Sequence, residues 1–184
     1  MKKTVWTFGL ISGAIISALM ALTIPFQDEL GFDHSLVVGY TTMVLAFLLI
    51  YFGVRSYRDN AGGGSVRFGR AFAVGALIAV ISSACYVATW EVMYFNFMPD
   101  FLSKYQAREL EKARAGGASE KVIAQQKAEM DKMAQMYQNP VINAAMTFAE
   151  PLPVGLVIAL VSAGILSRAS KREPDGMMDG ARGV

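Results

Sequence analysis

The chain has 184 residues, which suits one domain of ordinary size. Hydrophobic residues make up 54% of it and charged residues 17%, whereas soluble proteins average about 45–50% and about 25%. This deficit of charge excludes an ordinary soluble globular protein. The formal net charge of +2 gives no excess that would point to a nucleic-acid partner. A single cysteine and a single histidine exclude an intramolecular disulfide and disfavour a histidine-rich metal site, so we expect no metal and no cofactor.

Four long segments of the chain are almost free of charge. No Asp, Glu, Lys or Arg occurs in residues 4–27, 34–54 or 71–90, and residues 141–167 contain only Glu150. Each segment reaches the ~20 apolar residues that a helix needs to cross a bilayer core. The first is longer than the apolar run of a signal peptide, so we expect it to remain as a span. The sequence therefore predicts an all-α membrane protein with four transmembrane helices, at about residues 5–26, 35–54, 71–98 and 141–167.

A polar segment of the chain, residues 99–140, separates the third and fourth spans. Apolar residues recur in it at helical spacing on both sides of Gly116 and Gly117. Ser119 before an acidic residue is typical of a helix start. We expect residues 99–140 to form an extracytoplasmic helical hairpin, residues 1–170 to form a single transmembrane domain, and residues 171–184 to be a disordered cytoplasmic tail.

The distribution of basic residues predicts the orientation of the chain. Four spans place both termini on one side, which would carry ten basic residues. The other side would carry seven, spread over residues 99–140 and balanced by six acidic residues. Because cytoplasmic loops carry the excess of Lys and Arg, we expect both termini to be cytoplasmic.

Small residues recur every four positions on three of the predicted spans. They are Gly9, Gly13 and Ser17 in the first span, Gly75 and Ala79 in the third, and Gly155 and Ala159 in the fourth. Such faces allow close approach of helix backbones in lipid. They serve either packing of the helices within one chain or a homodimer, and the sequence leaves both interpretations open.

Two carboxylates lie within the predicted spans. Glu150 precedes Pro151 and Pro153 and lies roughly 16 Å into the fourth span, near the middle of a bilayer core of ~30 Å. Glu91 lies roughly 10 Å from the external end of the third span. Acids at such depth are costly and are therefore candidates for function. Glu150 and Glu91 either form a proton or cation site, or Glu150 is neutral and hydrogen-bonded to a Tyr, Thr or Asn side chain.

The loop between the second and third spans is basic and rich in glycine. Arg55, Arg58, Arg67 and Arg70 flank residues 62–64, which are all glycine. We expect the four arginines to contact anionic lipid headgroups. The alternative is a phosphate held by the glycine-rich segment and the helix that follows it. No lysine of a P-loop is present, which disfavours nucleotide hydrolysis.

Short motifs along most of the chain together form a specific combination. They are Gly9-Leu10-Ile11-Ser12-Gly13, Gly39-Tyr40-Thr41-Thr42-Met43, Tyr57-Arg58-Asp59, Phe68-Gly69-Arg70-Ala71-Phe72, Trp90-Glu91, Met98-Pro99-Asp100-Phe101, Tyr137-Gln138-Asn139-Pro140 and Glu150-Pro151-Leu152-Pro153. The combination resembles the bacterial domain-of-unknown-function family 4199 over nearly the whole chain. The resemblance implies a small bacterial inner-membrane protein with four helices, and it implies no particular activity.

The residues favour a non-enzymatic function, because no nucleophile–base pair or metal cluster is visible. We expect a protein that acts by assembly, as a homo-oligomer or as a small subunit beside a larger membrane partner. The alternative is a small ion- or proton-coupled transporter that uses Glu150 and Glu91. The expected partners are membrane lipids and a second copy or another membrane protein, without nucleic acid.

Overall fold

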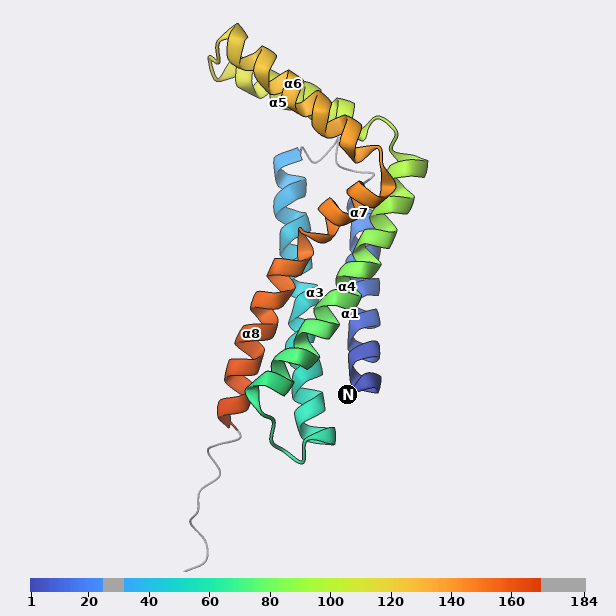
Figure 1. Cartoon of the computed structure of the whole chain (residues 1–184), viewed down its shortest axis with the longest axis vertical. Coiled ribbons are helices and arrows are strands. Elements are labelled where there is room, and N and C mark those ends of the chain that lie inside the picture. The colour runs from blue at the N-terminus through green and yellow to red at the C-terminus, as the bar shows by residue number, and fades with distance from the viewer. Residues whose placement is uncertain (25–31, 170–184) are drawn as a thin grey trace, which may run out of the picture. The chain divides into compact units, whose positions relative to one another are not determined.

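The computed structural model describes residues 1–24 and 32–169 (Figure 1). The described part contains helices and turns but no strand. The helices are α1 (Lys2–Thr23), α3 (Phe32–Ala61), α4 (Phe68–Phe97), α5 (Phe101–Ala115), α6 (Glu120–Tyr137), α7 (Pro140–Phe148) and α8 (Pro151–Ala169). The last residues of the first predicted span, 25–26, and the predicted disordered tail, 171–184, lie outside the described residues.

Within the described residues, four helical segments are long and apolar enough to cross a membrane. They are Lys2–Thr23, Val37–Ala61, Phe68–Phe97 and Pro140–Ser167, and the last of them comprises both α7 and α8. The predicted fold class, an all-α protein with four transmembrane helices, is thereby confirmed. The chain is a multi-pass membrane protein.

The second span continues as a helix beyond the end of its charge-free segment. We predicted an end near Val54, and α3 ends at Ala61. Polar pairs one turn apart stabilise the extension, because Arg55 lies 3.7 Å from Asp59 and the amide of Asn60 donates to the Ser56 carbonyl. The loss of apolar residues at position 55 therefore marks the end of the apolar stretch and not the end of the helix.

The chain divides into two compact units, of which the first contains residues 1–83 and 151–184. In it, α1 packs against α3, and α3 packs against α8. Two buried serines join neighbouring helices through backbone carbonyls. The Ser12 hydroxyl donates to Ala46 at 3.0 Å, and the Ser82 hydroxyl donates to Gly9 at 3.1 Å. Such bonds are favoured in lipid, where no water competes for the hydroxyl.

The small-residue ladders lie at helix crossings within the first unit. A methyl group added at Gly9 would lie 2.8 Å from a methyl of Ile81 on α4. One added at Gly75 would lie 2.9 Å from Ala159 Cβ, and one added at Gly155 would lie 2.7 Å from Ala79 Cβ.

The other two small residues of the ladder on α1 are also at least partly covered by the rest of the chain. Gly13 is buried and Ser17 is half-buried. These contacts support the interpretation that the ladders pack the helices of one chain, because the faces that a homodimer would need are already occupied.

The second unit contains residues 84–150. In it, α5 packs against α6, and α6 packs against α7. Gly117 turns the chain between α5 and α6 with a φ of 80°, and the Ser119 hydroxyl accepts from the Val122 N–H at the start of α6. The predicted pair of helices on either side of these glycines is therefore present. Its extracytoplasmic location, like the single domain over residues 1–170, stays a prediction.

One polar contact between α5 and α6 has an electrostatic consequence. The Gln106 amide donates to Asp131 at 2.7 Å, and the Lys127 ammonium lies 2.9 Å from the other carboxylate oxygen. Both lower the pKa of Asp131, the hydrogen bond from Gln106 most. Protonation of Asp131 in acid therefore weakens this contact between α5 and α6.

Candidate functional site

The fourth span is interrupted after its first nine residues, Pro140–Phe148. Asn139 caps α7 by accepting from the Val141 N–H at 2.9 Å, and α7 ends at Phe148. Ala149 and Glu150 form a turn before α8 begins at Pro151. A proline has no N–H, so Pro151 and Pro153 cannot supply donors that a continuous helix would supply. A break in a membrane span is tolerated where protein or water covers it.

Glu150 lies at this break and is exposed on the surface of the chain. The Tyr86 hydroxyl lies 3.5 Å from one of its carboxylate oxygens. A separation of 3.5 Å is at the outer limit of a hydrogen bond, so this contact satisfies the carboxylate only weakly. A tyrosine was among the kinds of partner expected for Glu150.

A buried polar network centres on Asn143, which is 0% exposed. Its side-chain oxygen accepts from the Trp90 indole N–H at 3.1 Å and from the Thr147 hydroxyl at 3.2 Å. Its amide donates to the Tyr137 carbonyl at 3.2 Å, and the Tyr137 and Thr147 hydroxyls are 3.1 Å apart. Sequence reasoning missed this network. The available signal was the spacing of Asn143 and Thr147, two polar residues four positions apart on α7.

Aromatic rings surround the network in the second unit. The ring centroids of Trp90 and Phe101 are 5.1 Å apart, and those of Tyr94 and Tyr137 are 5.3 Å apart, both edge-on. Edge-to-face pairs of this kind add about 0.5–1.5 kcal/mol beyond the area they bury. The rings thus hold α4, α5 and α6 together around the polar atoms.

Glu91 contributes a second carboxylate to this unit. One of its oxygens is buried and has no hydrogen-bond partner within the described residues. Burial raises the pKa of Tyr137, the hydrogen bonds to that phenol lower it, and the negative charges of Glu150 and Glu91 raise it further. No group of three or more His, Cys, Asp or Glu suited to a metal ion occurs in the part of the chain that the structure describes.

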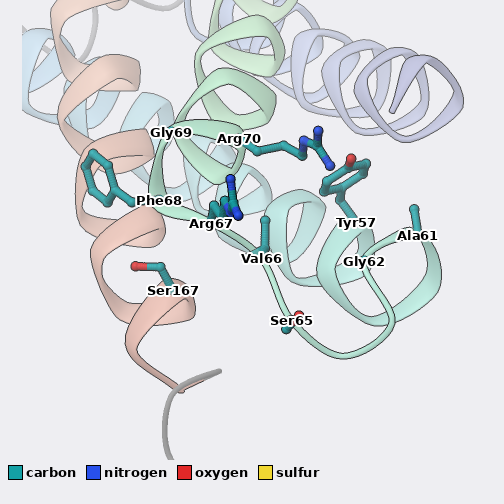
Figure 2. Close-up of a pocket in the computed structure, with 10 residues that line it drawn as sticks. All are labelled: Tyr57, Ala61, Gly62, Ser65, Val66, Arg67, Phe68, Gly69, Arg70 and Ser167. Atoms are coloured by element: carbon teal, nitrogen blue, oxygen red, sulfur yellow. The ribbon is translucent and has the colours of Figure 1, made fainter.

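The four arginines on either side of the α3–α4 turn fall into two pairs with different surroundings. Arg58 lies 2.7 Å from Asp59 and Arg55 lies 3.7 Å from it, so these two share one carboxylate as an ion-pair partner. Arg67 and Arg70 line a cavity of about 830 Å³ at the start of α4 (Figure 2). Within the described residues neither has an acidic partner. The sequence did not distinguish the two pairs.

Comparison with known proteins connects the chain to one family. A family model described as "Protein of unknown function (DUF4199)" matches residues 7–168. This match confirms the family that the sequence motifs suggested. Comparisons with curated proteins and with solved structures each found no match.

Proposed function

We propose that this chain, which belongs to that family of unknown function, is a non-enzymatic protein that acts by assembly in a bacterial inner membrane. It joins a second copy or a larger membrane protein through the surface around Glu150. The observation that carries the proposal is an exposed carboxylate at a break inside an apolar span. Lipid tails cannot satisfy such a group, so covering it with another protein lowers the free energy of the membrane-embedded chain.

The small-residue ladders support an assembly through a polar surface. Gly9, Gly75 and Gly155 pack against neighbouring helices of the same chain, so they offer no free face to a partner. The surface around Glu150 remains, with Met146 one turn earlier on α7, 39% exposed. Assembly at this surface would bury the carboxylate beside donors from the partner.

Both termini lie in the cytoplasm in this proposal, with α5 and α6 on the opposite side. The excess of basic residues at the ends of the spans nearest the termini supports this orientation. Reporter fusions after residues 54 and 170 should be active only as cytoplasmic reporters, and a fusion after residue 117 should be active only outside. An external signal at residue 170 would contradict the orientation.

The assembly itself is tested by purification in a mild detergent and determination of the protein mass of the particle. We expect more than one chain per particle, and we expect Glu150→Leu to release a single chain. Glu111→Leu is the matched control, because Glu111 is an exposed acid on α5 outside the spans. A wild-type particle that holds one chain and no other protein would contradict the proposal.

A second function, coupled transport of a proton or cation, is favoured by the buried oxygen of Glu91 that has no partner. In this alternative Glu91 and Glu150 would bind and release the ion, and carbonyls freed by the two prolines would assist. Glu150→Gln and Glu91→Gln should then each reduce the dependence of thermal stability on pH or cation concentration. Identical pH dependence in the wild type and both variants would exclude this alternative.

A further inference from the structure

A cavity in the first unit combines features that suit an anion. It lies where α3 ends and α4 begins, with Ser167 near the end of α8 also in its lining (Figure 2). Its lining includes three side chains that can donate hydrogen bonds to an anion, those of Arg67, Arg70 and Tyr57. Among the described residues no acidic side chain lines it, and Asp59 is engaged by Arg55 and Arg58 near the end of α3.

The position of the two arginines is unfavourable in the absence of an anion. Arg67 immediately precedes α4 and Arg70 lies in its first turn, three residues later. Like charges at this spacing repel each other, and the N-terminus of a helix already carries partial positive charge. Helix starts normally carry acidic residues for this reason, and α4 has none in its first turn. A bound anion would relieve both sources of repulsion.

Tyr57 provides an independent indication of a ligand. Its side chain is only 7% exposed, yet its hydroxyl makes no hydrogen bond within the described residues. Figure 2 shows the Tyr57 ring and the guanidinium of Arg70 among the side chains that line the cavity. The ring is buried, but the hydroxyl stays open to the cavity, so it can donate a hydrogen bond to an acceptor that enters from outside the chain.

The loop is built tightly enough to hold this arrangement. A methyl group at Gly62 would collide with the Ser65 carbonyl oxygen and lie 2.9 Å from the Arg58 carbonyl oxygen. Gly63 and Gly64 have φ values of 62° and 84°, which residues with a side chain rarely adopt. The three glycines therefore close a short turn that brings Tyr57, near the end of α3, to the same cavity as the start of α4.

We propose that this cavity binds one phosphate group, with Arg67 and Arg70 as charged donors and the Tyr57 hydroxyl as a neutral donor. Arginine guanidinium groups recognise phosphate oxygens through two parallel hydrogen bonds, which makes phosphate the anion of best fit. The phosphate belongs either to a lipid headgroup or to a soluble phosphorylated compound. The cavity lies at the ends of three spans, which is the level of the headgroups. This site is separate from the proposed assembly surface and does not depend on it.

Three probes distinguish the source of the phosphate. The full chain, purified in an uncharged detergent, is titrated with dioctanoyl phosphatidic acid, with inorganic phosphate, and with dioctanoylglycerol as a lipid without phosphate. Thermal shift gives the affinity and native mass spectrometry gives the stoichiometry. We expect saturable binding of one phosphatidic acid per chain and none of dioctanoylglycerol. Competition by inorganic phosphate at similar concentration would identify a soluble phosphate as the source, and failure to compete would identify the lipid.

Variants test the assignment of the donors. The double variant Arg67→Gln, Arg70→Gln should weaken phosphate binding roughly tenfold or more, because two charge-assisted hydrogen-bond donors are lost. Arg55→Gln is the matched control, with the same change of charge per residue near the end of α3 but outside the cavity lining, and should alter affinity less than about twofold. Tyr57→Phe keeps the ring and should weaken binding roughly threefold to tenfold.

Two results would overturn the assignment. One is the absence of saturable binding of either phosphate probe. The other is an equal loss of affinity in Arg55→Gln and in the double variant. If the double variant does not fold, Tyr57→Phe decides alone, and unchanged affinity in that variant rejects the site.

Discussion

Substitution of Gly155 by alanine tests the close contact between α4 and α8. The added methyl would lie 2.7 Å from Ala79 Cβ and 3.4 Å from the ring of Phe47. Non-bonded carbon atoms are at their best separation near 3.5–4.0 Å, so the two helices must separate by roughly 1 Å or the side chains must deform. Ala79 has no flexible atoms that could move aside. We therefore expect Gly155→Ala to destabilise the first unit.

The expected magnitude is a difference between two opposing effects. Overpacking of this kind costs about 1–3 kcal/mol. Alanine also gains about 1 kcal/mol over glycine in helix propensity, which opposes the loss. Gly164→Ala is the matched control on α8, because a methyl there meets nothing within 4 Å. The control variant gains helix propensity without overpacking. The free energy of unfolding of Gly155→Ala should therefore be lower than that of Gly164→Ala by about 1–3 kcal/mol.

A double-mutant cycle with Ala79→Gly assigns the effect to the contact itself. Removing the facing methyl should relieve the clash, so the double variant should be more stable than the sum of the two single effects by about 1–3 kcal/mol. The free energy of unfolding is measured in detergent under identical conditions for all variants. Equal stability of Gly155→Ala and Gly164→Ala, together with additivity in the cycle, would refute the helix crossing described for α4 and α8.

Three further predictions follow from the local geometry. Asn143→Ala should lower the free energy of unfolding by about 1–3 kcal/mol, because it leaves buried donors without an acceptor; the exposed Asn96→Ala should change it by less than about 0.5 kcal/mol. Gly64→Ala should destabilise by about 1 kcal/mol through its positive φ, whereas Gly69→Ala, with open space and an ordinary φ, should not. Because folding lowers the pKa of Asp131, its contribution to stability is present above the unfolded pKa of about 4 and is lost as pH falls through the folded pKa. Asp131→Asn should therefore remove part of the acid-induced loss of stability, measured by thermal unfolding between neutral and acid pH.

The sequence predicted features that depend on residues close together in the chain. Charge-free segments of sufficient length indicated the four spans, and Gly116, Gly117 and Ser119 indicated the ends of α5 and α6. The extension of α3 to Ala61 was missed because a change in polarity was taken as the end of a helix. Polar pairs one turn apart can support a helix beyond the end of its apolar stretch, as Arg55–Asp59 and Ser56–Asn60 do here.

Features that join distant residues could not be predicted. Asn143 accepts from Trp90, which is 53 positions earlier, and no local pattern indicates that contact. The same limit applies to the arginines. Arg67 and Arg70 share a cavity with Tyr57, whereas Arg55 and Arg58 pair with Asp59. The sequence identified all four arginines as candidates for binding an anion. Only the packing of the helices shows which of them lie without an acidic partner among the described residues.

The surface around Glu150 is the part of the proposal that a single measurement tests most directly. A photoreactive residue introduced at Met146 leaves the carboxylate intact and lies one turn before it on α7. The same residue at Val157, which is 60% exposed on α8, serves as the control for a lipid-facing position. After illumination of intact membranes, assembly predicts one discrete protein adduct from position 146 and none from position 157. Lipid adducts alone at both positions would contradict it.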